Sequence, residues 1–205
     1  MRRIVERAGP LALARTGATW EILWEGTFLM SSECRASERA LGALAAGRTL
    51  VAGLGMGFTL RAALDAPRVS AVDVIEIAQA VIDWNRGPLA PLAGFPLLDP
   101  RVRLRCADVR EVLDLVPAPY DAVLIDVDNG PSWVARPENA ALYGEAGVRR
   151  LRAAVCDGGT LAIWSAQPEP ALLAGLASCF GSVESRSVAV TVAGRAAEDV
   201  IVVAR

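Results

Sequence analysis

The sequence predicts an α/β protein built on a doubly wound, mostly parallel sheet. Two observations lead to this fold class: short apolar runs alternate with helical stretches along the middle of the chain, and the tail is rich in β-forming residues. With 205 residues, 53% of them hydrophobic, the chain can form one large buried core. Strands and helices that alternate in this way give a sheet covered on both faces, and ligands bind beyond the carboxyl ends of its strands.

The first expected element is a short β-hairpin near the amino terminus. Trp20–Trp24 and Thr27–Met30 flank the turn residues Glu25 and Gly26. We therefore expect residues 1–35 to form an extension that carries this hairpin, and residues 36–205 to form the main domain. Ser37 is the expected cap of the first helix, which contains the apolar positions that follow it.

The remaining elements follow in alternation. Strands are expected at Thr49–Leu54, Val69–Ile75, Val102–Cys106, Tyr120–Ile125 and Thr160–Trp164. The matching helices are expected at Phe58–Leu64, Ala78–Trp84, Val109–Leu115, Glu138–Ala154 and Pro168–Cys179. Ser182–Val192 and Val200–Ala204 are expected to pair as an antiparallel hairpin, which brings the sheet to seven strands.

The composition excludes several kinds of chemistry. All 21 basic residues are arginine and there is no histidine, so a lysine Schiff base, a Ser-His-Asp triad and a histidine-ligated metal are ruled out. The four cysteines are scattered without a C-x-x-C pair, and no metal site is expected. A net charge of −2 without a basic block argues against a nucleic-acid partner. No signal peptide or run of 18 apolar residues is evident, so we expect a cytoplasmic protein that does not enter a membrane.

A glycine cluster and an acidic residue follow the first two strands. Gly53, Gly55 and Gly57 let the chain turn tightly and approach a ligand closely, although such turns also need glycine for steric reasons alone. Glu76 ends the second strand, 21 residues after Gly55, a spacing at which a carboxylate can bind both hydroxyls of a ribose. The alternative role of Glu76 is to cap the next helix. Position and spacing together favour the ligand role.

Asp108 and Val109 follow the third strand. The carboxylate of Asp108 could accept a hydrogen bond from an adenine amino group, while the backbone N–H of Val109 reaches a ring nitrogen. Asp108 could equally be the N-cap of the next helix, and the two roles are compatible.

Asp126 and Asp128 close the fourth strand. Turn chemistry explains the Asn129-Gly130-Pro131 sequence that follows, but it does not explain a carboxylate at the end of an otherwise buried strand. Asp126 is therefore the best candidate for the reaction centre, with Asp128 beside it.

Between about Gly26 and Ala166 the sequence resembles the spermidine synthase-like proteins, within the class I methyltransferase fold. The resemblance rests on the glycine cluster and on a succession of short motifs: Val74-Ile75-Glu76-Ile77, Asp99-Pro100-Arg101-Val102, Ala107-Asp108, the segment from Tyr120 to Asp126, and Leu142-Tyr143. It implies that Glu76 binds the ribose and Asp108 the adenine of S-adenosylmethionine or its decarboxylated form. Asp126 would match the aspartate that helps to deprotonate the attacking amine in aminopropyltransferases.

The sequence also departs from that family. Met56 replaces the aspartate of the family's glycine-rich turn, and the turn from Asp126 to Pro131 is shorter and differently charged. The family's Tyr-His-Glu segment has no counterpart around Ser37 and Glu38, and the amino-terminal β-domain is reduced to one hairpin. Because a diamine carries two positive charges, the loss of carboxylates predicts weaker diamine binding and no marked preference for a decarboxylated donor.

Three functions follow from these residues. The first is transfer of a methyl group from S-adenosylmethionine to a small-molecule acceptor, which depends mainly on alignment of the reactants. The alternative is aminopropyl transfer to an amine, and the third is nucleoside binding without catalysis. Met56 favours the first and the third, whereas Asp126 favours an enzyme. A homodimer is one possible assembly, and the sequence does not determine the oligomeric state.

Overall fold

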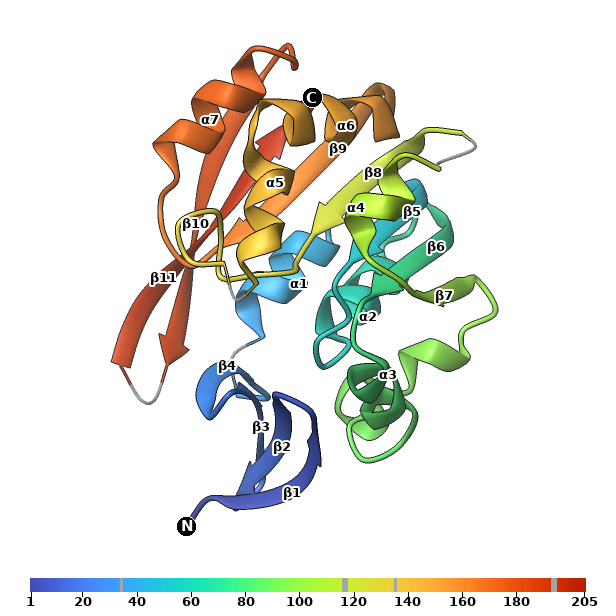
Figure 1. The fold of residues 1–205 in the computed structure, drawn as a ribbon. Helices are drawn as coiled ribbons and strands as arrows, with labels where there is room; N and C mark the ends of the chain where they lie inside the picture. Colours follow the sequence, from blue (N-terminus) through green and yellow to red (C-terminus); the bar gives the residue numbers. More distant parts are fainter. Residues whose placement is uncertain (34, 116–117, 135, 193–194) are drawn as a thin grey trace.

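The chain folds around two β-sheets in the computed structural model, which describes residues 1–33, 35–115, 118–134, 136–192 and 195–205. The first sheet is antiparallel and contains β1 (Arg3–Ala8), β2 (Leu11–Thr16), β3 (Thr19–Trp24) and β4 (Thr27–Ser31). Figure 1 shows this sheet in blue, below the main body of the molecule. The expected hairpin is present as β3 and β4.

The expectation of a single amino-terminal hairpin was wrong, because β1 and β2 precede it in the same sheet. Charged residues interrupt the apolar positions of β1, which is mostly exposed, so the segment gave little sign of a strand. In β2, by contrast, Leu11, Ala12, Leu13 and Ala14 are all buried. Four apolar residues in a row are as compatible with a helix as with a strand. Tertiary packing of β2 against β3 decides between them.

The second sheet has seven strands in the order β10-β11-β9-β8-β5-β6-β7, as expected for this class of fold. These strands are β5 (Gly47–Ala52), β6 (Val69–Glu76), β7 (Val102–Cys106), β8 (Tyr120–Ile125), β9 (Val155–Ser165), β10 (Val183–Val192) and β11 (Arg195–Ala204). Pairing is parallel from β7 through β9 and antiparallel at β11 and β10. The carboxyl ends of β5, β6, β7, β8 and β9 therefore share one edge.

Helices cover both faces of this sheet (Figure 1). The α-helices are α1 (Ala36–Gly42), α2 (Phe58–Asp65), α3 (Gln79–Arg86), α4 (Val109–Leu113), α5 (Ala140–Tyr143), α6 (Glu145–Ala154) and α7 (Pro170–Ala177). Short 3₁₀ turns lie at Ala90–Ala93, Pro96–Leu98 and Pro137–Asn139. Successive residues of β5 point to opposite faces: Val51 packs in one apolar cluster, and Leu50 and Ala52 pack in the other. The first cluster also contains Leu13 and Ile22, so the amino-terminal sheet packs against the same core.

The segment expected as one helix from Glu138 to Ala154 is divided. Gly144 has an extended backbone (φ −74°, ψ 171°) that ends α5 and caps α6. A side chain at Gly147 would overlap the carbonyl oxygens of Ala141 and Leu142, so the two helices meet closely there. The strand after α6 also begins earlier than expected, at Val155. Ser37 is not the cap of α1, because the helix already begins at Ala36.

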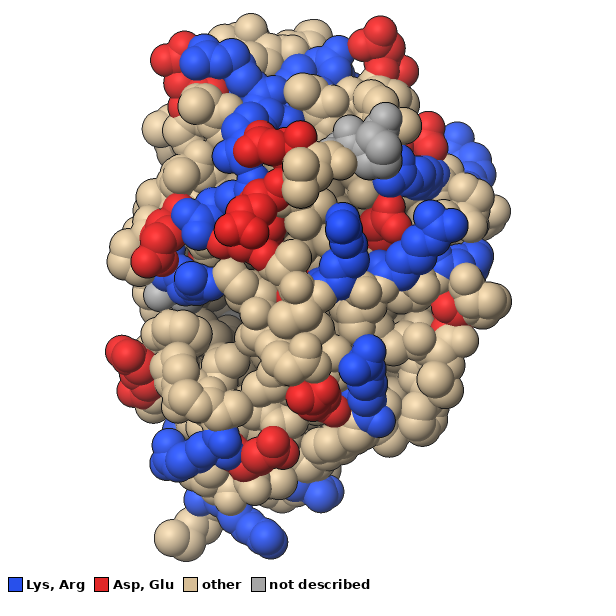
Figure 2. Space-filling view, turned by 45° about the vertical axis from the view of Figure 1, so that its right-hand side comes forward, with Lys and Arg blue, Asp and Glu red and all other residues tan. Residues whose placement is uncertain are grey.

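The surface agrees with a chain that lacks a basic block. Arginine and carboxylate side chains are interspersed on the face shown in Figure 2. In the part of the chain that the structure describes, no helix is long and apolar enough to cross a membrane. Cys106, Cys156 and Cys179 are free thiols, and Cys34 lies outside the described residues. The boundary expected near residue 35 stays a prediction.

Candidate active site

A cavity of about 930 Å³ lies between the amino-terminal sheet and the carboxyl edge of the parallel strands. Ile22, Trp24 and Phe28 line it from the amino-terminal sheet, and the turns after β5, β6, β7 and β8 line it from the other side. Its volume is in the range of pockets that enclose a small ligand. Every predicted site residue except Gly57 is among its lining residues.

The glycine turn after β5 is built by close packing. Gly53 has φ 92°, and a side chain there would overlap the carbonyl oxygen of Asp126 at the end of the neighbouring strand. Gly55 has φ 51°, and a Cβ atom would stand 2.8 Å from the sulfur of Met30. Gly57 has φ 81° and is the N-cap of α2, outside the cavity. Steric need thus accounts for all three glycines, and Gly53 and Gly55 also bring backbone to the cavity wall.

Glu76 is buried at the end of β6, and its carboxylate ties two loops together. One oxygen accepts the N–H of Leu54 at 2.9 Å, and the other accepts the N–H of Ala78 at 2.8 Å. Burial raises the pKa of Glu76, while these backbone donors oppose the rise. The N–H groups of Ile77 and Gly55 also lower its pKa, so ribose hydroxyls would share the four or so lone-pair sites of this carboxylate with backbone donors. The side chain therefore has a structural role beside the predicted ligand role.

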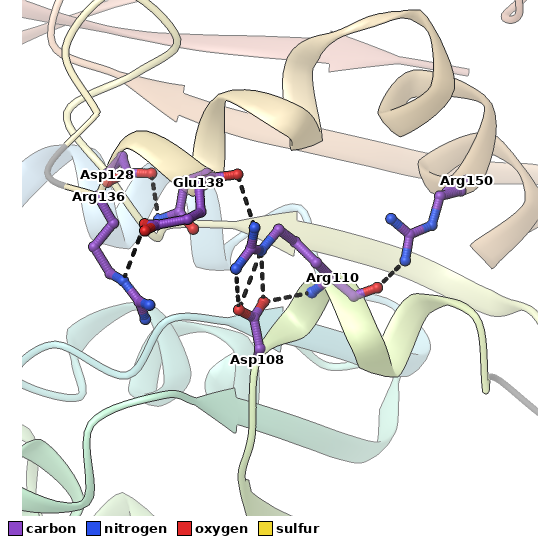
Figure 3. Close-up of polar contacts among 7 residues, drawn as sticks. Asp108, Arg110, Asp128, Arg136, Glu138 and Arg150 are labelled. Atoms are coloured by element: carbon purple, nitrogen blue, oxygen red, sulfur yellow. Dashed lines mark hydrogen bonds and ion pairs between the residues drawn. The ribbon is translucent and has the colours of Figure 1, made fainter.

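Asp108 is the N-cap of α4 and the partner of an arginine. Its Oδ1 accepts the N–H of Arg110 at 2.9 Å, and its Oδ2 lies 2.6 Å from the Arg110 guanidinium. The Arg110 side chain holds the pKa of Asp108 below its usual range. Arg110 also donates to the carbonyl of Glu138 at 2.9 Å, and Arg150 donates to the carbonyl of Arg110; Figure 3 shows this network. The capping role is thus present, and Val109 lies beside it on the cavity wall.

Asp126 follows β8 and is half-buried at the cavity wall. Its backbone N–H donates to the carbonyl of Ala52 at 2.8 Å, and its Oδ2 accepts the hydroxyl of Thr59 at 2.6 Å. Desolvation raises the pKa of Asp126 to about 6; the charges of Asp199 and Glu76 add to the rise, and the hydrogen bond from Thr59 opposes it. A carboxyl group in this state can both hold a cation and accept a proton.

Asp128 lies on the loop after Asp126. Its Oδ2 accepts the side-chain amide of Asn139 at 2.7 Å, which connects this loop to the segment before α5 (Figure 3). The buried carboxylate of Glu169 accepts the backbone N–H and the hydroxyl of Ser132, at 3.1 and 2.7 Å. Both contacts hold the loop that follows Asp126 in place.

Two carboxylates that the sequence did not single out share the cavity with Asp126. Glu38 comes from the first turn of α1, and Asp199 comes from β11. The hydroxyl of Ser37 lies 2.6 Å from Asp199 Oδ2 and 3.2 Å from Glu38 Oε2. Burial and the charge of Asp126 raise the pKa of Glu38 to about 7. Glu38, Asp126 and Asp199 are called the acidic half of the cavity below.

The other half consists of Gly53, Gly55, Glu76, Asp108 and Val109 and is called the turn half. Asp199 could have been found from the sequence, because it directly precedes the apolar run Val200–Ala204, which is the pattern of Asp126 in reverse order. In an antiparallel partner of β9, the start of that run lies where β9 ends: Val200 pairs with Ser165. Glu38 carries no comparable signal, since an acidic residue in the first turn of a helix is common on any surface.

The described residues that line the cavity include eight carboxylates and two arginines. Arg2 is paired with Glu21 at 2.8 Å, and Arg136 lies 3.7 Å from Glu138, so neither is committed to the acidic half. No group of three or more metal-ligating side chains among the described residues is arranged to hold a metal ion. The arrangement suits an extended organic cation, which can meet carboxylates one at a time.

Known proteins resemble this chain in sequence and in fold. No protein-family model matches the sequence. Polyamine aminopropyltransferase 2 of Pseudomonas aeruginosa is 30% identical over 147 residues, which are 66% of this chain and 40% of that protein. The chain therefore spans about 40% of the length of this relative.

Two solved structures match nearly the whole chain. Spermidine synthase from Thermotoga maritima gives a TM-score of 0.82 at 15% identity, covering 98% of this chain and 72% of that one. A spermidine synthase in complex with the transition-state analogue AdoDATO gives 0.83 at 15% identity, covering 98% and 73%. The protein thus has a spermidine synthase-like fold, including the amino-terminal antiparallel sheet. These similarities favour the aminopropyltransferase alternative and give no specific support to methyl transfer.

Proposed function

We propose that the protein is an aminopropyltransferase that takes decarboxylated S-adenosylmethionine as donor and a cationic amine as acceptor. The observation that supports this most is the acidic half of the cavity. Glu38, Asp126 and Asp199 come from three separate elements and face one space, where burial opposes the ionisation of Glu38 and Asp126. Such a site gains most from a ligand that carries positive charge.

The turn half fits the nucleoside part of this donor. Glu76 would bind the ribose beside its backbone donors, and Asp108 with Val109 would lie along the adenine. The bound sulfonium donor supplies an electrophilic carbon and a neutral leaving group. The protein's own contribution is to place the amine against that carbon and to remove a proton from it.

An amine is protonated at neutral pH and attacks only as the free base. Asp126, in the acidic half, would hold the ammonium group through its charge and orient the nitrogen, with Asp128 on the same loop. The hydrogen bond from Thr59 and the backbone bond to Ala52 fix Asp126 in position. With a pKa of about 6, Asp126 is mostly ionised at neutral pH and keeps the charge that holds the ammonium group.

Methyl transfer remains a second candidate because of Met56. This side chain is fully buried and packs in the core, so the turn offers no carboxylate to a protonated aminopropyl group. An enzyme that uses S-adenosylmethionine itself would have no need for one there. A nucleoside-binding protein without catalysis is the third candidate and predicts binding without turnover.

Turnover with paired donors separates these candidates. Purified protein is incubated with decarboxylated S-adenosylmethionine, or with S-adenosylmethionine, and a panel of amines that carry one, two or three amino groups. Mass spectrometry then detects methylthioadenosine or S-adenosylhomocysteine. We expect methylthioadenosine, an amine-dependent product and faster turnover with di- and triamines. Formation of S-adenosylhomocysteine in its place would establish methyl transfer. If no donor–amine pair gives either product, nucleoside binding without catalysis is the remaining candidate.

A further inference from the structure

Glu38, Ser37 and Asp199 form a hydrogen-bonded chain at the cavity wall. Glu38 and Asp199 both line the cavity, and Ser37 and Asp199 are only 1% and 8% exposed. The Oγ of Ser37 is within reach of both carboxylates, at 3.2 Å from Glu38 and 2.6 Å from Asp199. Trp164 donates from its indole to Asp199 at 3.4 Å and so approaches the far end of the chain.

A serine hydroxyl has only one proton, so it can donate to one of these carboxylates at a time. The shorter contact assigns that proton to Asp199. A hydrogen bond between Ser37 and Glu38 then needs a proton on Glu38, which donates to the serine oxygen. The serine oxygen can thus accept the proton of a protonated Glu38, whereas an ionised Glu38 keeps its own backbone N–H as a donor and shares the single proton of Ser37 with Asp199.

The charges around Glu38 also favour its protonated form. The charged groups that face it are Asp126, at the end of β8, and Asp199, on β11, and both are acidic. The arginines of the neighbouring helices are engaged or exposed: Arg35 lies over the ring of Phe58, Arg39 is exposed, and Arg61 pairs with Asp65. Two like charges and partial burial favour the neutral form of Glu38.

We propose that Glu38 is the catalytic residue that accepts the proton of the amine, that Asp126 stays ionised beside it, and that Ser37 and Asp199 are positioning residues. This rests on the proposed aminopropyl transfer. In the step, an N–H bond of the ammonium group breaks and an O–H bond forms on Glu38. The nitrogen keeps the electron pair, and an ammonium–carboxylate pair becomes a neutral amine and a neutral carboxyl group. The new proton on Glu38 points to Ser37, whose own proton remains directed at Asp199.

The division of labour between Glu38 and Asp126 follows from their positions. Asp126 already accepts a hydrogen bond from the hydroxyl of Thr59 at 2.6 Å, and that bond stabilises its ionised form. Glu38 instead lies beside two acidic groups, Asp126 and Asp199, which favour its protonated form, and the oxygen of Ser37 can accept the proton that it then carries. The raised pKa of Glu38, about 7, agrees with this assignment, and that of Asp126 is lower, at about 6.

The first test needs no substrate. Carbon-13 NMR of the glutamate side-chain carboxyls follows the pH titration of the ligand-free protein, and Glu38→Gln identifies the Glu38 signal by its loss. We expect a midpoint near 7 that falls in Asp126→Asn, falls less in Asp199→Asn and stays unchanged in Glu145→Gln, an exposed carboxylate on α6. A Glu38 midpoint that Asp126→Asn does not move would overturn the proposal.

The second test uses turnover. In Glu38→Gln we expect kcat/KM above pH 8 to fall by at least about 10²-fold, a usual loss for an acid–base group, and the acidic limb near pH 7 to disappear. In Asp126→Asn and Asp199→Asn the acidic limb of the pH profile of kcat/KM stays but moves to lower pH. A merely structural role of these residues would not produce that shift. A wild-type limb in Glu38→Gln would overturn the role of Glu38 alone. Absence of turnover in the wild-type protein with every amine would overturn the proposed function itself, whatever the NMR titration shows.

Discussion

The two halves of the cavity neutralise their carboxylates in different ways. In the turn half, Glu76 is bound by backbone N–H groups and Asp108 by the guanidinium of Arg110, so both charges have local partners. In the acidic half, the charge of Asp126 raises the pKa of Glu38, and the side-chain donors beside these two carboxylates are the hydroxyls of Ser37 and Thr59. The carboxylates of the turn half thus have partners within the protein, whereas the acidic half is electrostatically suited to a positively charged ligand.

This contrast also separates two tasks. A nucleoside is recognised by a fixed frame of hydrogen-bond acceptors and backbone, which the protein stabilises at little cost. An amine is recognised by charge, and charge that is left unpaired costs stability in the empty protein. Variants in the two halves should therefore change different measured quantities.

The largest expected effect is on turnover, from Asp126→Asn. The change keeps the shape of the side chain and its ability to accept the hydroxyl of Thr59, but it removes the charge. We expect kcat to fall by at least about 10²-fold while donor affinity, measured by calorimetry, stays within about twofold. Asp128→Asn is the matched change on the same loop and should cost less than 10-fold. A stable Asp126→Asn protein with full turnover would make Asp126 a structural residue.

Donor affinity should change most at Glu76. Loss of the hydrogen bonds to the ribose in Glu76→Ala should weaken binding of methylthioadenosine by about 1.5–3 kcal/mol. The structure adds that stability will also fall, because the N–H groups of Leu54 and Ala78 lose their acceptor. Glu76→Gln keeps one acceptor oxygen and should lose less of both. Unchanged affinity for every adenosyl ligand would remove Glu76 from the binding site.

The acidic half should make the empty protein less stable as pH rises. Glu38 and Asp126 have pKa values of about 7 and about 6 in the folded protein, above the values of 4.5 and 3.8 expected without these surroundings. Between about pH 4 and pH 7 the folded state thus binds more protons than the unfolded state, so this contribution to stability is present at low pH and lost through that window. Asp126→Asn should raise the melting temperature by roughly 2–6 °C at pH 8. At pH 4, where Asp126 is protonated in the folded state, the gain should vanish; equal gains at both pH values would contradict the raised pKa.

The smallest effect is expected at Asp108. Because Asp108 is the N-cap of α4, Asp108→Ala should lower the free energy of unfolding by about 1 kcal/mol. Since both carboxylate oxygens already bind Arg110, adenosine affinity should change by less than that. Arg110→Ala tests the pair from the other side and should free Asp108 without removing the cap. An affinity loss in Asp108→Ala that exceeds the stability loss would favour direct contact with adenine.

The turn half was predictable because its signals are local. Gly53, Glu76 and Asp108 each follow a strand whose apolar pattern is unambiguous, and parallel strands place their carboxyl ends at one edge. The same reasoning found Asp126. The strand limits of β7 and β8 were also predicted correctly. Asp99-Pro100 and Asp108 flank β7, and Pro119 and Asp126 flank β8, so both runs are sharply bounded.

The acidic half depends on contacts between residues far apart in the sequence. Ser37 and Asp199 are 162 positions apart, and neither belongs to a motif. Their meeting requires α1 to pack beside β11, which is a property of the tertiary fold. The same limit applies to β1 and β2: an exposed charged strand and four consecutive apolar residues become a sheet only by pairing with β3.

Titration calorimetry with two donors tests the central claim most directly. S-adenosylmethionine and its decarboxylated form share the nucleoside and the sulfonium group, and differ by one carboxylate that would meet the acidic half. From Met56 alone the sequence predicted no marked preference. With Glu38, Asp126 and Asp199 in the same cavity, we expect the decarboxylated donor to bind at least about 10-fold more tightly, which is about 1.4 kcal/mol. Equal affinities, or tighter binding of S-adenosylmethionine, would contradict the account and favour methyl transfer.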